Sequence, residues 1–115
     1  MSFTIYHNPK CSTSRNVLGY LRDAGHEPRI IEYLKTPPSK TELKGLIKRM
    51  GAKTSDVVRW KEPIAGELGL DKNESGDEEL LEAMIEHPIL INRPIVVTDE
   101  AVRLCRPSET VKELL

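Results

Sequence analysis

The chain has 115 residues, with 17 lysines and arginines against 18 aspartates and glutamates, and its formal net charge is −1. This length fits one domain, and 38% hydrophobic residues are enough for a core of ordinary size. The near-neutral total argues against a protein held on nucleic acid or on a membrane surface by bulk charge. The apolar runs are shorter than the roughly 18 residues of a transmembrane helix. Residues 1–6 are too short and polar for a signal peptide, so we expect a cytoplasmic protein.

The first part of the chain predicts a β-α-β unit. Residues 3–6 alternate apolar and polar side chains, as a strand does. Residues 12–24 carry apolar side chains at helical spacing, and Gly25 follows where a left-handed helix end is favoured. Residues 29–34 predict a second strand, which Thr36-Pro37-Pro38 ends.

Helices are predicted in the middle of the chain. Ser39 and Glu42 form a capping box, and the helix that they begin ends at Gly51. Short helices are expected at residues 55–59 and 64–68. A longer helix is expected at residues 77–86, with an acidic outer face that we interpret as solvation.

The last part of the chain predicts a hairpin and a helix. Residues 95–97 have the pattern of a buried strand, residues 101–105 can return as its hairpin partner, and a helix begins near Ser108. The element order predicts an α/β protein with a four-stranded mixed sheet covered by helices. We expect one domain, residues 1–115, with a helical insertion at about residues 36–91.

The charge is divided unevenly. Residues 1–70 carry 12 basic and 7 acidic side chains, whereas residues 71–115 carry 5 and 11, so the first half could hold an anion. The two cysteines, Cys11 and Cys105, are too few for a disulfide framework, and a reducing cytosol disfavours a structural bridge. Each thiol is therefore judged singly.

Chemistry-bearing residues concentrate between the first predicted strand and the first helix. Cys11 lies at the helix N-terminus, where unpaired N–H groups and the helix dipole favour a thiolate. His7, Lys10 and Arg15 can add positive charge. The same N–H groups, with the hydroxyls of residues 12–14, could cradle a tetrahedral oxyanion. A nucleophile and an anion site are thus predicted together.

A plainer interpretation remains open, because an isolated cysteine is more often a small buried residue and a Ser/Thr cluster before a helix usually caps it. Ser14 stands where a Cys-x-x-Cys oxidoreductase has its resolving cysteine, so a redox cycle would need an outside thiol. Cys105, inside an apolar strand pattern, is expected to be buried and inert. We expect no metal and no bound cofactor.

Three arginines are further candidates: Arg59, Arg93 and Arg106. Taken singly, each is most simply a surface or ion-pair residue. Together they matter because the forked guanidinium suits a tetrahedral oxyanion better than lysine does. Arg93 precedes Pro94, whose peptide bond can be cis at the entry to the strand, although trans is commoner.

Four segments, in this order, closely resemble the glutaredoxin-coupled arsenate reductases, and the resemblance covers nearly the entire chain. The segments are Ile5-Tyr6-His7-Asn8-Pro9 with Cys11 and Ser14-Arg15, Glu32-Tyr33-Leu34 with Pro37-Pro38, His87 to Val97, and Arg103 to Glu109.

The resemblance implies a thioredoxin-like fold, a cis-proline at Pro94 and the reduction of arsenate to arsenite. In that family the thiolate matching Cys11 attacks arsenic, and the position matching His7 tunes the thiol. Several residues are implied to hold the oxyanion. These are Ser14, Arg15, Arg59, Arg93 and Arg106.

The resemblance also implies that glutathione is a co-substrate and glutaredoxin a partner, with no nucleic acid and no membrane involved, and we expect a monomer. Two alternatives stay open, because relatives share the fold without sharing the function. One is a general glutathione-dependent thiol reductase. The other is an Spx-type redox-sensing regulatory module, many of which use a cysteine pair that Ser14 removes here.

Overall fold

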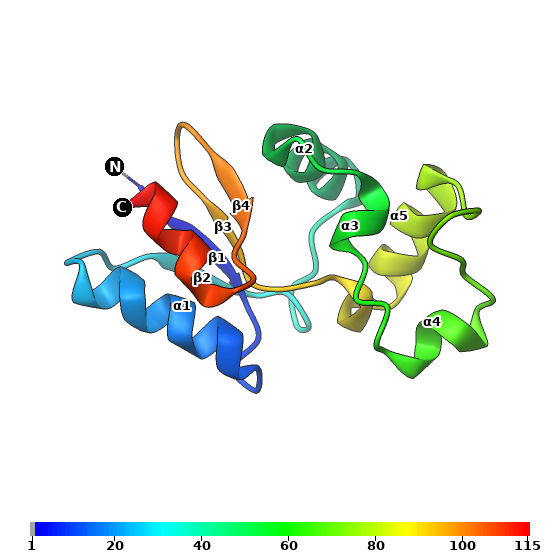
Figure 1. Ribbon diagram of the computed structural model, residues 1–115, viewed down its shortest axis with the longest axis horizontal. Helices are drawn as coiled ribbons and strands as arrows, with labels where there is room; N and C mark the ends of the chain where they lie inside the picture. Colours follow the sequence, from blue (N-terminus) through cyan, green and yellow to red (C-terminus); the bar gives the residue numbers. More distant parts are fainter. Residues whose placement is uncertain (1) are drawn as a thin grey trace. The chain divides into compact units, whose positions relative to one another are not determined.

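The computed structural model describes residues 2–115 and divides into two compact units. The first comprises the chain up to Thr36 together with Arg93–Leu115, and the second is Pro37–Asn92, drawn mostly in green and yellow in Figure 1. The second unit begins and ends within about a residue of the predicted helical insertion. Its helices bury apolar faces against one another, and the prediction of one domain stays a prediction.

The first unit contains a four-stranded mixed sheet with the strand order β2-β1-β3-β4, which confirms the predicted fold class. β1 pairs in parallel with β2, whereas the β1–β3 and β3–β4 pairs are antiparallel. The strands are β1 (Thr4–His7), β2 (Arg29–Glu32), β3 (Ile95–Val97) and β4 (Val102–Leu104). The second strand is shorter than predicted, because residues 33–35 form a turn.

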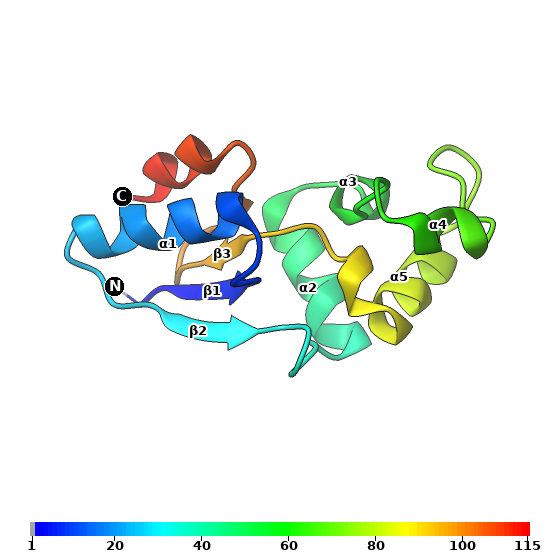
Figure 2. The ribbon, with the colours of Figure 1, turned by 90° about the horizontal axis from the view of Figure 1, so that it is seen from below.

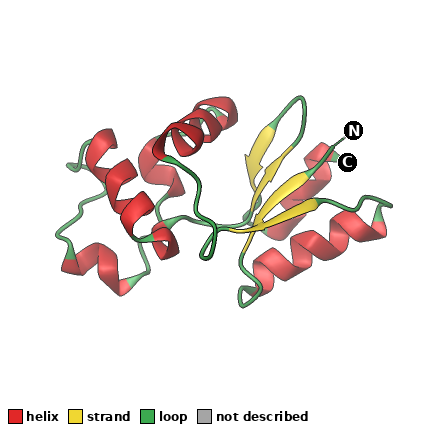
Figure 3. Ribbon diagram, turned by 180° about the vertical axis from the view of Figure 1, so that it is seen from behind, coloured by secondary structure: helices red, strands yellow, loops and turns green. Residues whose placement is uncertain are grey.

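Two helices lie on one face of this sheet, α1 (Ser12–Asp23) and the 3₁₀-helix η2 (Ser108–Leu114), as Figures 2 and 3 show. Apolar side chains from the sheet and from both helices form the core between them. The members include Ile5, Val17, Leu21, Val96, Cys105 and Val111. The helix predicted near Ser108 is present, but it is of the tighter 3₁₀ type. The N–H of Thr110, for example, bonds the carbonyl of Pro107 at 3.0 Å.

The second unit consists of short helices in the predicted order, α2 (Lys40–Met50), α3 (Thr54–Val57), α4 (Pro63–Glu67), α5 (Asp77–Glu86) and the 3₁₀-helix η1 (Pro88–Leu90). The capping box of Ser39 and Glu42 is formed, and Gly51 adopts a φ of +68° at the other end of α2. These two signals explain why this helix was predicted accurately.

The acidic face of α5 does more than solvate the helix. Lys40 pairs with Glu78 and Glu82, and Lys44 also pairs with Glu78, so ion pairs join α2 to α5. All four side chains are more than a third exposed, so these pairs add little to stability. Within residues 2–115, no helix has both the length and the apolar character that crossing a membrane requires.

Candidate active site

The loop between β1 and α1 is held in place by backbone hydrogen bonds around Asn8. The N–H of Cys11 donates to the carbonyl of Asn8, and the N–H of Lys10 donates to the Asn8 side-chain oxygen, both at 3.0 Å. Asn8 is buried. Asn8 is not among the predicted site residues, although an Asn-Pro pair between a strand and a helix is a turn signal that points to it.

Ser14 ties the loop to the first turn of α1. Its hydroxyl is fully buried, accepts the N–H of Asn8 at 3.1 Å and lies 2.6 Å from Nδ1 of His7. The hydroxyl therefore links the loop to α1, and its part in anion binding stays a prediction. The backbone N–H of Ser14, by contrast, hydrogen bonds to the Cys11 thiol.

Cys11 is the N-cap residue of α1, with extended backbone angles and a half-buried side chain. Arg106, just after β4, donates from Nη1 to the Sγ of Cys11 at 3.7 Å and to the carbonyl of Arg93 at 2.9 Å. Arg93 is buried and its side chain also bonds to the Cys11 thiol. The structure thus brings two of the three candidate arginines to the Cys11 thiol.

Both of these arginines precede a cis peptide bond. The bond between Arg93 and Pro94 is cis, at the position where the family resemblance implied one. The bond between Arg106 and Pro107 is also cis, which was not predicted from the sequence.

Competing effects set the pKa of Cys11. Burial is the largest effect and would raise the pKa of the thiol. Hydrogen bonds from the Ser14 N–H and from the Arg106 and Arg93 side chains, with the charge of Arg93, outweigh it and hold the pKa below its usual value. The thiolate is therefore favoured, as the helix N-terminus predicts.

His7 contributes less charge than the sequence suggested. Burial, with the charges of Arg22 and Arg15, lowers the pKa of the imidazole, although Glu32 opposes this. At neutral pH His7 is therefore mainly neutral, and the positive charge at the thiol comes from the two arginines. Arg15 is exposed, and its Nη1 donates to the carbonyl of Pro9 at 2.9 Å, which braces the loop.

Two remaining residues, Arg59 and Cys105, form no hydrogen bond with the Cys11 thiol within residues 2–115. Arg59 belongs to the helical unit, where its Nε lies 3.2 Å from a carboxylate oxygen of Glu62, and its part in anion binding stays a prediction. Cys105 lies fully buried in the core of the first unit, and burial, with the charge of Glu113, raises its pKa to about 12. The burial predicted for Cys105 is confirmed, and its raised pKa disfavours the reactive thiolate.

The sheet topology and the thiol at the start of α1 define a thiol-dependent oxidoreductase of the thioredoxin-like class. Across residues 2–115, no cluster of three or more histidine, cysteine, aspartate or glutamate side chains is placed to hold a metal ion.

Comparisons with known proteins agree with this class. The ArsC family model matches residues 6–114. The chain is 54% identical over 115 residues to an arsenate reductase of Rhizobium meliloti and covers 82% of that protein. It is 52% identical over 114 residues, 99% of the chain, to an arsenate reductase of Escherichia coli K12, of which it covers 81%. A solved arsenate reductase from Vibrio cholerae matches all of the chain and 98% of its own, with a TM-score of 0.94 at 46% identity. The chain belongs to the ArsC family.

Proposed function

We propose that this protein reduces arsenate to arsenite, with Cys11 as the nucleophile. The observation that carries the proposal is the contact of the Cys11 sulfur with Arg106 at the N-terminus of α1. Relatives at 54% and 52% identity that bear the name arsenate reductase support the choice of substrate.

The two arginines at the thiol suit a tetrahedral oxyanion. Guanidinium groups present several N–H donors in a fixed plane and stay charged at every working pH, so they can bind two oxygens of one anion. Arg93 is buried and Arg106 is half-buried, which strengthens such contacts relative to exposed ones. Arg59 is implied to bind the anion by the family resemblance alone.

In the first step, the Cys11 thiolate attacks arsenic(V) and forms a sulfur–arsenic bond. One arsenate oxygen leaves as water after it takes up a proton. The arginines stabilise the negative charge of the oxygens while this bond forms. His7 acts through Ser14, 2.6 Å away, and helps to hold the loop that positions the thiol.

In the second step, an external thiol supplies the second sulfur, because Ser14 replaces a resolving cysteine and Cys105 is buried in the core. Glutathione attacks the adduct, and arsenic(III) leaves as arsenite with the two electrons that the two sulfurs give up. The sulfurs are left as a Cys11–glutathione disulfide. Glutaredoxin then attacks the glutathione sulfur and restores the Cys11 thiol.

The test is arsenite formation by the purified protein with arsenate, glutathione and a glutaredoxin. The wild type should turn over repeatedly, Cys11→Ser should give no arsenite, and omission of glutathione should stall the reaction. The matched control Cys105→Ala removes the other thiol and should retain most activity. Absence of arsenite, with reduction of small glutathione disulfides, would instead favour a general thiol reductase.

A further inference from the structure

Asn8 is a buried polar residue in the loop that leads to Cys11. It is 4% exposed and comes directly after β1. Its side-chain Oδ1 accepts the backbone N–H of Lys10 at 3.0 Å, and its carbonyl accepts the N–H of Cys11 at the same distance. Its own N–H donates to the Ser14 hydroxyl at 3.1 Å. One residue therefore bonds to the loop, to Cys11 and to the first turn of α1.

Residues 8–11 form a tight turn, which the bond from the Cys11 N–H to the Asn8 carbonyl closes. Pro9 has the fixed φ that suits the second position of such a turn. The Asn8 side chain adds a bond within the turn, because it accepts the N–H two positions later. The other two bonds of Asn8 use backbone groups that almost any residue provides. The side chain of residue 8 therefore acts on the turn through the Lys10 N–H.

The turn ends at Cys11, whose backbone angles place its sulfur. As the N-cap of α1, Cys11 has a φ of −93° and a ψ of 121°. These extended angles direct an N-cap side chain to the N–H groups of the first helical turn. The Ser14 N–H bonds to the thiol from that turn, and Nη1 of Arg106 lies 3.7 Å from the sulfur. Hydrogen bonds weaken steeply as their geometry is lost, so both donors depend on the conformation of Cys11.

A second side chain also bonds to this loop, but it is more open to water. Nη1 of Arg15 donates to the carbonyl of Pro9 at 2.9 Å, and the Arg15 side chain is exposed. Water competes for an exposed bond, whereas Asn8 is buried. Asn8 is therefore the better placed of the two to fix the turn.

We propose that Asn8 is a positioning residue for Cys11, whose side chain fixes the turn that holds the sulfur against the Ser14 N–H and Nη1 of Arg106. This role rests on the proposed function, in which Cys11 is the nucleophile. Asn8 acts through the backbone of Lys10 and Cys11. Loss of its side chain should therefore change the reactivity of the thiol while both donors remain in the chain.

The test is the rate of iodoacetamide alkylation of Cys11 against pH in the folded full chain, with a urea titration of each variant. Asn8→Ala removes the Oδ1 acceptor and should raise the pKa of Cys11. Below that pKa, alkylation should be about two- to tenfold slower, the factor for the loss of one hydrogen bond to the thiolate. Asn8→Ser keeps a neutral oxygen that accepts such an N–H more weakly, so its rate should lie between those of Asn8→Ala and the wild type.

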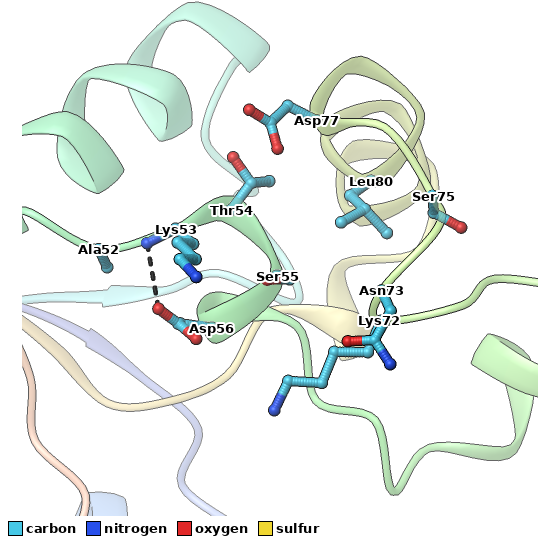
Figure 4. A pocket seen from close by; sticks show the side chains of 10 residues that line it. All are labelled: Ala52, Lys53, Thr54, Ser55, Asp56, Lys72, Asn73, Ser75, Asp77 and Leu80. Carbon is cyan, nitrogen blue, oxygen red and sulfur yellow. Dashed lines mark hydrogen bonds between the residues drawn. The ribbon is translucent and has the colours of Figure 1, made fainter.

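A bond of the same kind in the helical unit provides a structural control. Oδ2 of Asp56 accepts the backbone N–H of Lys53 at 3.1 Å, at the start of α3 (Figure 4). Asp56→Ala removes this acceptor and should leave the alkylation profile of Cys11 unchanged. Equal slowing by Asp56→Ala and Asn8→Ala would overturn the proposal, because a loss of stability alone would then explain both results.

A double variant tests the coupling to Arg106. Because Asn8→Ala already weakens the contact of Arg106 with the sulfur, Asn8→Ala with Arg106→Gln should slow alkylation by less than the product of the two single factors. Factors that multiply, or a wild-type titration of Cys11 in a destabilised Asn8→Ala, would overturn the proposal. If Asn8→Ala does not fold, Asn8→Ser takes its place in the same comparisons. Alkylation needs no arsenate, so these outcomes are independent of the arsenate assay.

Discussion

The contact between Arg106 and Cys11 allows a quantitative prediction. Arg106→Gln keeps a polar side chain of similar reach but removes the charge and the Nη1 donor that lies 3.7 Å from the Cys11 sulfur. Because this donor helps to lower the pKa of Cys11, the variant should have a higher Cys11 pKa and less thiolate at a given pH.

The magnitude follows from the geometry. A hydrogen bond from a charged donor contributes about 1.5–3 kcal/mol. Water reaches the half-buried thiol and screens the interaction, so we take about 1 kcal/mol. At a pH below the pKa of the thiol, this free energy corresponds to about fivefold less thiolate. The initial rate of Cys11 alkylation should fall by the same factor.

The assay is the rate of iodoacetamide modification against pH, followed by mass spectrometry of the Cys11 peptide. Arg103→Gln is the matched control: it also removes an arginine near the end of the chain, but Arg103 pairs with Glu113 at 3.6 Å. The reasoning would be refuted if Arg106→Gln reacted like the wild type. The reasoning would also be refuted if Arg103→Gln lowered the rate of Cys11 alkylation equally, because the loss of a distant charge would then explain the effect.

Three further predictions concern reactivity and stability. Because its pKa is lowered, Cys11 should react with iodoacetamide faster than an unperturbed cysteine, with a pKa of about 8.5, does at neutral pH. Cys105, with a pKa of about 12, should stay unmodified in the folded protein, and similar rates for the two thiols would contradict this. Ser14→Ala should lower the free energy of unfolding by about 1–3 kcal/mol in urea titrations, because buried loop groups lose their partner, and an unchanged midpoint would count against it. Gly19→Ala should raise the free energy of unfolding by about 0.5–1 kcal/mol, because Gly19 lies inside a helix and an added Cβ meets open space there. Gly51→Ala should lower the free energy of unfolding by a similar amount, because Gly51 has a φ of +68°. Changes of the same sign in the two variants would refute the reasoning.

Much of the fold follows from short-range signals in the sequence. The capping box at Ser39 and the glycine at position 51 bound α2, and apolar spacing predicts α1 to within a residue. Cys11 was found for the same reason, because a strand followed at once by a helix places the intervening residue at the helix N-terminus. Such features depend on neighbours within about four positions.

The charge environment of the site was not determined by local sequence. Arg106 lies 95 positions after Cys11. Its guanidinium reaches the Cys11 thiol only when β3 pairs with β1 and β4 pairs with β3 in the sheet. His7 appears in the sequence as a possible cation, but burial at the end of β1 makes it mainly neutral. The pairing of strands that are distant in sequence determines which side chains come into contact. Burial shifts the pKa values of these side chains, because a charged group loses hydration when it leaves water. The sequence by itself determined the candidate nucleophile, Cys11, and its helix, and only the tertiary structure decided which arginines lower its pKa.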